Sequence, residues 1–343
     1  MKVAIIGITG LVGKKISWLL EKRQFPVNRL IGVASSLSEG KKHIYKHYTI
    51  DIVNIEKFMI DHIYNNSSEI IVFFATSNNV SGKWIPKILE HNKNAWIIDN
   101  SSEYRLHKNV PLVIPEINSH KITPKTRIIA NPNCSTAQLV MVLYPLHIMY
   151  KIKRVVVSTY QSVSGAGYAG ENQLSLEREN SMKLEILDSK KIDRVFPTKI
   201  DMNCIAQCGD IDAISGYTSE EIKLERETPK ILEDNIKITA TAVRVPVTGG
   251  HSESVNIEFE NSYNLENILD ILKSTKGIQV KDMACPSDVY LEDNVWVSRI
   301  RKDYSNKNSI NLWIVADNLM KGAALNAVQI AEYIIKSGYV IST

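Results

Sequence analysis

The chain has 343 residues, of which 44% are hydrophobic and 23% charged, and its formal net charge is +4. This length allows two domains with a large core, and so small a net charge does not indicate a nucleic-acid-binding protein. No apolar segment is long enough to span a membrane, and the N-terminal apolar stretch is too short for a secretory signal. We therefore expect a cytoplasmic protein without a nucleic-acid or membrane partner.

The N-terminus has the pattern of a dinucleotide-binding unit. Residues 2–6 form an apolar β-type run, and Gly7, Gly10 and Gly13 follow at once. Apolar side chains then recur at helical spacing over residues 12–20. A strand, a glycine-rich turn and a helix together form the site where a pyrophosphate meets a helix N-terminus. The spacing is GxxGxxG rather than GxGxxG, so the prediction rests on the position of the turn more than on its glycines.

The turn after the second predicted strand bears on the choice of nicotinamide cofactor. Residues 30–34 read as this strand, and hydroxyls and lysines follow it at 35–42. An enzyme that uses NAD usually carries an acidic residue at the strand end, where it binds the ribose hydroxyls. Its absence here predicts NADP, and an ordinary polar turn that binds nothing is the alternative.

Strands and helices alternate in the first part of the chain, which predicts a parallel sheet with helices on both faces. The pattern becomes mixed after about residue 131, which predicts a second, α+β domain on a broad sheet. We expect residues 1–131, completed by a C-terminal helix at 320–343, to bind the cofactor, and residues 132–319 to form the second domain. The remaining predicted strands are 69–74, 95–99, 127–130, 154–160, 236–247, 254–259, 295–297 and 312–315, and the predicted helices include 84–89, 265–272 and 323–336.

Residues 131–137, Asn-Pro-Asn-Cys-Ser-Thr-Ala, read as a turn between a strand and a helix. Cys134 then lies in or just before the first helical turn, where unpaired N–H groups and the helix dipole favour a nucleophilic thiolate. The alternative is a small buried hydrophobe. Cys204, Cys208 and Cys285 match no zinc pattern and are interpreted as structural or incidental, so no metal is expected.

Further polar residues occupy positions suited to a ligand site. Arg105 follows the strand at 95–99, and Gln161 precedes a glycine-rich turn. Glu220 and Lys223 would share a face if their segment is helical. Arg244 and His251 flank the turn at 245–250. Most surface ion pairs and arginines contribute only solvation, so each residue has a structural alternative.

Together these motifs resemble the aspartate-β-semialdehyde dehydrogenases over nearly the whole chain. The resemblance implies an N-terminal Rossmann-type domain plus an α+β catalytic and dimerisation domain with a large mixed sheet. It also implies a homodimer or a dimer of dimers. The segments that carry the resemblance are GITGLVG at 7–13, DNSSEYR at 99–105, VIPEIN at 113–118, NPNCST at 131–136, QSVSGAG at 161–167, RVPV at 244–247, GHSES at 250–254 and ADNLMKGAA at 316–324.

The resemblance implies the NADPH-dependent reductive dephosphorylation of L-aspartyl β-phosphate to L-aspartate β-semialdehyde, reversible with NADP⁺ and phosphate. This reaction serves the biosynthesis of lysine, threonine, methionine and diaminopimelate. An acyl phosphate is an activated acyl donor, so a cysteine thiolate can form a thioester that accepts hydride. A histidine can accept and return the protons of this reaction, because its pKa lies near working pH.

By the resemblance, Cys134 is the nucleophile, His251 the acid/base and Gln161 the residue that orients the acyl group. Arg244 would bind the substrate α-carboxylate, and Glu220, or its neighbour Glu221, the α-ammonium group. Phosphate would be held by Arg105, Lys223 and the amide of Asn133. The residues expected to bind the cofactor are Gly7, Thr9, Gly10, Leu11, Val12, Ser35, Ser36, Ser38, Gly165 and Asn318.

One departure from the family is Leu37, where many relatives carry arginine, so NADP preference is expected to be weaker. The nearest alternative enzyme is an N-acetyl-γ-glutamyl-phosphate reductase, whose acylated amine would leave Glu220 without a cationic partner. An alternative of another class is a catalytically silent NADP-binding module. That alternative predicts the loss of a reactive residue, yet Cys134, Gln161, Arg244 and His251 are all present.

Overall fold

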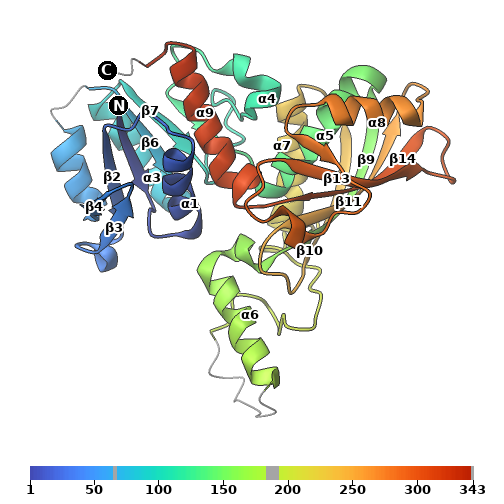
Figure 1. Cartoon of the computed structure of the whole chain (residues 1–343), viewed down its shortest axis with the longest axis horizontal. Coiled ribbons are helices and arrows are strands. Elements are labelled where there is room, and N and C mark those ends of the chain that lie inside the picture. Colours follow the sequence, from blue (N-terminus) through green and yellow to red (C-terminus); the bar gives the residue numbers. More distant parts are fainter. Residues whose placement is uncertain (65–67, 183–192, 341–343) are drawn as a thin grey trace. The chain divides into compact units, whose positions relative to one another are not determined.

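The computed structural model describes residues 1–64, 68–182 and 193–340. It divides the chain into two compact units (Figure 1). The first comprises Met1–Asn133 and the C-terminal segment from Ala323, and the second comprises Cys134–Gly322. The division therefore falls directly before Cys134 and directly after Gly322.

The first unit is built on a six-stranded sheet in the order β5-β2-β1-β6-β7-β8, and every pairing in it is parallel. Parallel strands covered on both faces are continuous apolar runs, and all five residues of β6 and of β7 are buried. The predicted parallel sheet is therefore confirmed. Its strands are β1 (Lys2–Ile6), β2 (Arg29–Ala34), β5 (Val53–Asn54), β6 (Ile70–Phe74), β7 (Ala95–Asp99) and β8 (Ile128–Ala130).

The C-terminal helix α9 (Leu325–Lys336) completes the first unit by packing against α1 and β7 (Figure 1). Arg23 makes a bidentate ion pair with Glu332, with N–O distances of 2.7 and 2.9 Å. The Trp96 ring stacks on Tyr339 at a centroid distance of 6.1 Å. The other helices of this unit are α1 (Leu11–Lys22), α2 (Ile55–Phe58), α3 (Asn78–His91) and α4 (Pro115–Asn118).

A two-stranded hairpin in the first unit is absent from the sequence-based prediction. It pairs β3 (Lys42–Tyr45) with β4 (Tyr48–Asp51) in antiparallel register. Its two-residue turn uses Lys46 and His47, and Lys46 adopts a positive φ of 52°. The usual hairpin signal is Asn-Gly or Asp-Gly, because those residues adopt positive φ at low cost. Without them, the sequence of this turn does not indicate a hairpin.

The second unit is built on a mixed six-stranded sheet in the order β10-β9-β11-β14-β13-β12. Its three central pairings, β9–β11, β11–β14 and β14–β13, are antiparallel, whereas the outer pairs β10–β9 and β12–β13 are parallel. The predicted broad mixed sheet is therefore confirmed. The strands are β9 (Ile152–Gln161), β10 (Lys237–Arg244), β11 (His251–Phe259), β12 (Ile278–Val280), β13 (Val295–Lys302) and β14 (Ser309–Ala316).

Helix α5 (Cys134–Tyr150) is the buried helix of the second unit. It contacts strands β9, β11, β13 and β14 as well as α7 (Ser219–Leu232) and α8 (Leu265–Ser274). Its buried residues include every position from Ser135 to Leu143, so the helix is enclosed on all sides there, as expected of a core helix. The nucleophile candidate therefore begins an element that the rest of the unit holds tightly.

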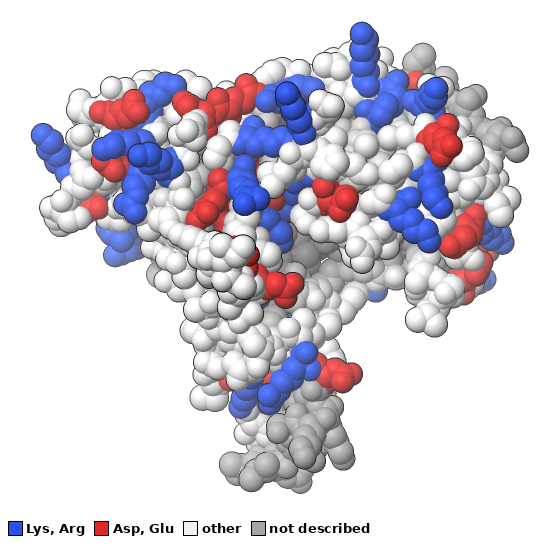
Figure 2. Space-filling model, turned by 180° about the vertical axis from the view of Figure 1, so that it is seen from behind, with Lys and Arg blue, Asp and Glu red and all other residues white. Residues whose placement is uncertain are grey.

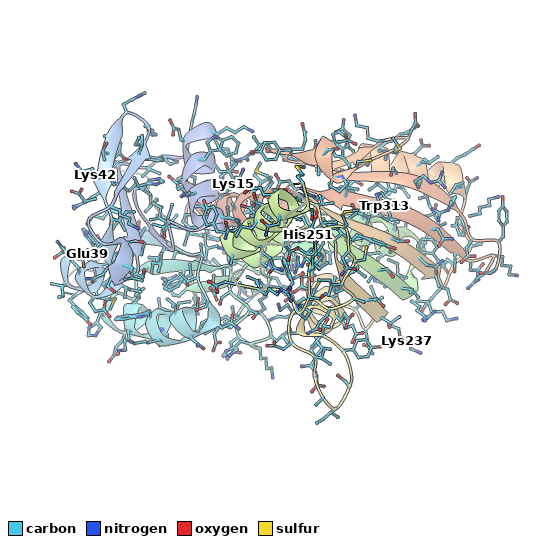
Figure 3. The ribbon with its side chains drawn as sticks, turned by 90° about the horizontal axis from the view of Figure 1, so that it is seen from below. Lys15, Glu39, Lys42, Lys237, His251 and Trp313 are labelled. Atoms are coloured by element: carbon cyan, nitrogen blue, oxygen red, sulfur yellow. The ribbon has the colours of Figure 1, made fainter. Side chains whose placement is uncertain are left out.

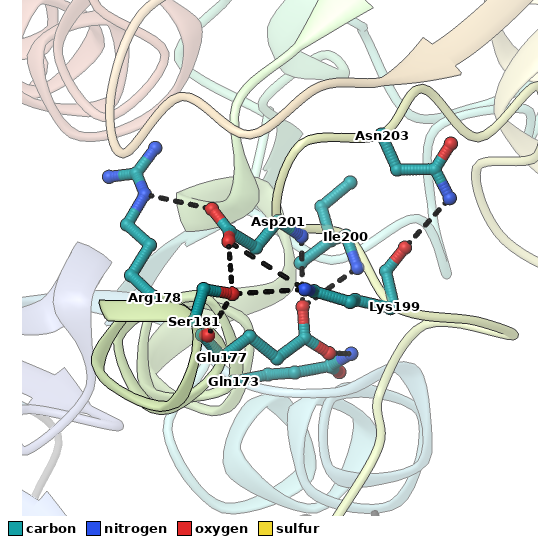
Figure 4. A network of polar contacts seen from close by, with 8 residues as sticks. All are labelled: Gln173, Glu177, Arg178, Ser181, Lys199, Ile200, Asp201 and Asn203. Carbon is teal, nitrogen blue, oxygen red and sulfur yellow. Dashed lines mark hydrogen bonds and ion pairs between the residues drawn. The ribbon is translucent and has the colours of Figure 1, made fainter. Parts of the chain in front are cut away.

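Helix α6 (Gly167–Met182) is fastened to the segment at 195–203 by buried polar contacts (Figure 4). Glu177 accepts hydrogen bonds from the backbone N–H groups of Ile200 and Asp201 at 2.8 and 2.9 Å. Gln173 accepts two more from the backbone at 195 and 196. Arg178 donates to the backbone carbonyl of Pro246. These contacts hold Phe196 beside the site described below.

Basic and acidic side chains are interspersed over the molecular face in Figure 2. The small net charge of +4 is consistent with this mixture. Across residues 1–64, 68–182 and 193–340, no helix combines the length and the apolar character that a membrane crossing requires.

Candidate active site

Cys134 is the first residue of α5 and directly follows the segment that leaves β8. It is partly exposed, unlike the buried residues that follow it in the helix. The backbone of Gly322 lies against it, because a Cβ at Gly322 would come 2.8 Å from the Cβ of Cys134. Any larger residue at 322 would displace the nucleophile candidate, which explains the glycine in the ADNLMKGAA segment.

Gln161, the last residue of β9, is buried beside the first turn of α5. Its Nε2 donates to Oγ of Ser135 at 2.9 Å and to Oε1 of Glu220 at 3.1 Å. Oγ1 of Thr159 lies 3.3 Å away. The amide therefore connects the helix of Cys134 to the acidic residue of α7.

The structure separates the two adjacent glutamates of α7. Glu221 accepts from the backbone N–H groups of Thr218 and Ala242, at 2.6 and 2.8 Å, so both its oxygens cap backbone donors. Glu220 instead faces Gln161, and its other oxygen pairs with Nζ of Lys223 at 3.0 Å. Glu220 is thus the carboxylate that faces the site, and Lys223 lies on the same helical face.

His251 begins β11 and is fully buried (Figure 3). Its Nδ1 accepts a hydrogen bond from the backbone N–H of Ser162 at 3.1 Å, and the Ser162 hydroxyl lies at the same distance. Its Nε2 has no partner in the described part of the chain. A buried polar atom without a partner is costly, so this nitrogen marks a place where a ligand atom is expected.

Burial, and then the nearby charge of Arg244, lowers the pKa of His251 to about 3. The imidazole is therefore neutral at physiological pH. Because Nδ1 accepts from a backbone N–H, the single ring proton lies on Nε2. The ring consequently presents a hydrogen-bond donor, rather than an acceptor, toward the open side of the site.

Arg244, the last residue of β10, is a buried guanidinium without a carboxylate partner among the described residues. Its Nη1 donates to the carbonyl of Ser162 at 2.6 Å, and its charged end lies 5.6 Å from the Phe196 ring. Its Nε has no acceptor within residues 1–64, 68–182 and 193–340. A buried cation requires compensation, so the pocket is suited to an anionic group.

Gly165 and Asn318, both predicted to bind the cofactor, lie around His251. A Cβ at Gly165 would come 2.8 Å from Nη1 of Arg244 and 3.2 Å from Nε2 of His251. Asn318 accepts from the backbone N–H of Gly250 at 3.0 Å and also contacts the hydroxyl of Ser164. Asn318 therefore joins the two loops that flank the imidazole.

The glycine turn of the first unit has the close backbone packing that a pyrophosphate site requires. Gly7 has a φ of +93°, and a Cβ there would lie 2.3 Å from the carbonyl oxygen of Ala75. A Cβ at Gly13 would lie 2.1 Å from the carbonyl oxygen of Gly7. Helix α1 starts directly after Gly10, so no side chain of the N-cap residue covers the first N–H groups of the helix. The residues present therefore fit a dinucleotide at the helix N-terminus.

The polar turn after β2 is solvent-exposed. Ser36–Ser38 forms one turn of 3₁₀ helix, and the Leu37 side chain is 88% exposed. Lys41 is exposed, and Lys42 begins β3 beyond Glu39 (Figure 3). Apart from Glu39, which is engaged by the side chain of Asn54 at 2.8 Å, the turn carries no acidic residue.

Arg105 and Asn133, both predicted to bind phosphate, belong to the first unit. Both are buried, and Arg105 donates to the carbonyl of Asn100 at 2.7 Å. The second unit brings together Gln161, Glu220, Lys223, Arg244 and His251 around the start of α5.

Comparison with known proteins agrees with this arrangement. Residues 2–124 match the profile of the semialdehyde dehydrogenase NAD binding domain, and residues 143–321 that of the semialdehyde dehydrogenase dimerisation domain. An aspartate-semialdehyde dehydrogenase of Rickettsia bellii is 43% identical over 98% of both chains. Aspartate-semialdehyde dehydrogenase 2 of Vibrio cholerae is 40% identical over 97% of both chains.

The chain belongs to the aspartate-semialdehyde dehydrogenase family.

Solved structures agree with this family assignment. Aspartate semialdehyde dehydrogenase II of Vibrio cholerae, complexed with ASA, has a TM-score of 0.90, at 38% identity over 98% of both chains. As an aspartate-semialdehyde dehydrogenase, the chain carries a domain for a nicotinamide dinucleotide and a dimerisation domain.

Sequence reasoning missed several polar residues that lie near His251. Ser162 orients the imidazole, and Gln138 donates from α5 to the backbone carbonyl of His251 at 3.3 Å. Glu253 is fully buried on the same strand face as His251. Spacing was the available signal, because Gln138 is four residues beyond Cys134 on a helix and Glu253 two beyond His251 on a strand.

The described residues contain no group of three or more His, Cys, Asp or Glu side chains that could hold a metal ion. Burial raises the pKa of Cys208 to about 11, although Arg244 is nearby. Cys208 is therefore a thiol that does not compete with Cys134 as a nucleophile.

Proposed function

We propose that this chain reduces L-aspartyl β-phosphate to L-aspartate β-semialdehyde with NADPH, reversibly, through a thioester on Cys134. The observation that carries the proposal is the buried guanidinium of Arg244, which lies near His251 and has no carboxylate partner among the described residues. A substrate α-carboxylate would supply the missing anion to Arg244. An α-ammonium group would meet Glu220, which already faces the site.

Cys134 acts first. Its thiolate attacks the acyl carbon, the C–S bond forms, and phosphate leaves with the electron pair of the broken C–O bond. The nicotinamide dinucleotide that the first unit is proposed to hold would supply a hydride to the thioester carbon. The resulting oxyanion re-forms a carbonyl as the C–S bond breaks, which releases the aldehyde and regenerates the thiolate. Each tetrahedral stage places negative charge on the former carbonyl oxygen.

His251 is proposed to stabilise that oxygen. In the resting geometry its Nδ1 is occupied by the Ser162 N–H and its Nε2 carries the proton. The ring therefore enters the reaction as a neutral donor that can hydrogen-bond the oxyanion. Preorganised donors of this kind are effective because they need no reorientation during the reaction. Gln161 hydrogen-bonds both Glu220 and the start of α5, and so fixes their relative positions.

The first unit is proposed to bind NADP through Gly7, Thr9, Gly10, Leu11 and Val12. The hydroxyls of Ser35, Ser36 and Ser38 are proposed for the 2′-phosphate, with Lys41 and Lys42 as the nearest cations in sequence. The exposed Leu37 supplies no charge there, so measurable use of NAD is expected beside NADP. Arg105, Asn133 and Lys223 are proposed for phosphate. The match to a dimerisation domain supports a homodimer, and a dimer of dimers is the larger assembly proposed.

The decisive assay is phosphate-dependent reduction of NADP⁺, followed at 340 nm. Aspartate semialdehyde is expected to be turned over, whereas N-acetylglutamate semialdehyde is not, because its acylated amine offers Glu220 no positive charge. Omitting phosphate should abolish the reaction, since phosphate releases the acyl group. Preference for the acetylated substrate would instead identify an N-acetyl-γ-glutamyl-phosphate reductase. No turnover of either substrate would indicate a silent NADP-binding module.

Replacing Arg244 with leucine is expected to damage substrate use selectively. Removing one partner of a buried, hydrogen-bonded charge pair costs about 2–5 kcal/mol, or roughly 30- to 5000-fold in kcat/KM. The dissociation constant of NADP should change little. Arg226→Leu is a matched control, because Arg226 is an exposed arginine on α7. If Arg244→Leu altered only cofactor affinity, the proposed role of Arg244 would be wrong.

A further inference from the structure

Glu253 is a buried acid that the proposed mechanism does not use. It lies in β11, two residues beyond His251, and its side chain is fully buried. Neither carboxyl oxygen has a hydrogen bond of good geometry to any described residue. An ionised carboxylate in such a place would be very costly, whereas a protonated one needs only a single acceptor.

The groups around Glu253 come from three other elements. The Gln138 side chain of α5 interacts with the carboxyl and lowers its pKa, which opposes the larger effect of burial, and Thr159 of β9 and Ile314 of β14 are the register partners of Glu253 in the sheet. The titratable neighbour on its own strand face is His251, which is itself neutral. Burial raises the pKa of Glu253 well above its usual range.

Gln138 uses the nitrogen of its side-chain amide but not the oxygen. Its Nε2 donates to the backbone carbonyl of His251 at 3.3 Å, and its Oε1 has no partner among the described residues. A protonated Glu253 would supply the O–H that this oxygen lacks. The single amide would then connect the acid, the backbone of His251 and the helix that begins at Cys134.

We propose that Glu253 is a positioning residue that acts as a neutral acid, donating to Gln138 so that Gln138 holds the His251 backbone against the helix of Cys134. This inference rests on the proposed function, because the geometry being held is that between the thiolate and the imidazole. Glutamine in place of Glu253 retains both a donor and an acceptor. Methionine retains the size but removes both.

The test compares Glu253→Gln with Glu253→Met in the full-length enzyme. The glutamine variant should keep a kcat near that of the native chain. The methionine variant should lose about 10- to 100-fold in kcat with little change in KM, because small misplacements of reacting groups are costly while substrate binding is unaffected. If the methionine variant kept its kcat, or if glutamine were as damaging as methionine, the inference would be overturned.

A second variant covers the case in which Glu253→Met does not fold. Gln138→Met removes the donor to the His251 carbonyl and should also lower kcat while leaving KM little changed. Native kcat in that variant would contradict the inference.

Two further readouts are independent of turnover. Cys134 alkylation by iodoacetamide should be several-fold slower in either methionine variant than in the glutamine variant, and equal rates would refute the inference. If the native enzyme did not turn over aspartate semialdehyde, the proposed function would fail, yet the alkylation rates would still test the positioning role.

The pH dependence of Tm gives the second readout. A carboxyl whose pKa is raised on folding must take up a proton to fold, so native stability falls as pH rises above the unfolded value. Glu253→Gln escapes this cost. Its Tm should therefore exceed the native Tm by a margin that grows between pH 5.5 and pH 8, and a constant margin would show that Glu253 is ionised in the fold.

Discussion

Replacing Cys134 with alanine is expected to reduce NADPH oxidation with aspartyl phosphate by at least about 10⁴-fold, since removing the nucleophile of a catalytic unit costs on this order. The cost is so large because neither His251 nor Gln161 can form the acyl intermediate. Steady-state kinetics measure the loss. Isothermal titration should show that NADPH still binds, because the glycine turn lies in a separately packed unit. Substantial remaining turnover would exclude the thioester route.

Cys285→Ala is the matched control for the Cys134 variant. Cys285 is partly exposed, as Cys134 is, but it caps the short 3₁₀ turn Pro286–Val289 and does not begin a long helix. Its replacement should leave both turnover and iodoacetamide inactivation unchanged. Loss of inactivation in Cys285→Ala, with inactivation retained in Cys134→Ala, would place the reactive thiol at residue 285.

Replacing His251 with alanine is expected to lower kcat by about 10²- to 10³-fold, the usual contribution of one preorganised hydrogen-bond donor to an oxyanion. The pH dependence tests its state. Because the pKa of His251 is lowered to about 3, the ring stays neutral from pH 8 to pH 5, and its donor proton remains on Nε2. Native kcat should therefore show no imidazole limb near pH 6.5. A limb there that disappeared in the alanine variant would show that the ring titrates as an ordinary base.

The lowered pKa of His251 also makes the stability of the fold depend on pH. A histidine whose pKa is lowered on folding must lose its proton to fold. This deprotonation costs no stability when the pH is above about 6.5, the pKa of histidine in the unfolded chain. Stability is then lost as pH falls from about 6.5 toward 3, by up to about 1.4 kcal/mol per pH unit. His251→Asn should lose less stability than the native chain over this range in denaturant titrations. An equal loss of stability in the native chain and in the variant would contradict a neutral, buried imidazole.

Much of the fold follows from local sequence signals. The run at residues 2–6 and the glycines at 7, 10 and 13 predict β1 and the start of α1, and the apolar runs predict β6 and β7 to within one residue. Strand β11 begins three residues before its predicted start, at His251. The C-terminal helix begins at Leu325, because residues 320–324 form a π-helical turn, in which Gly322 packs against Cys134. Such a turn has no local sequence signature.

The sequence alone determined the family, the two-part architecture and the chemical types of the reactive residues, because periodicity, glycine turns and short motifs are local properties of the chain. The domain boundaries at 131/132 and 319/320, the individual residue roles and the NADP preference stay predictions. Only the tertiary structure decided that Glu220 rather than Glu221 faces Gln161, since Glu221 is used to cap a helix and to bond β10. It also decided that His251 is neutral with its proton on Nε2. Burial and hydrogen-bond partners depend on segments distant in the sequence, and no local pattern encodes them.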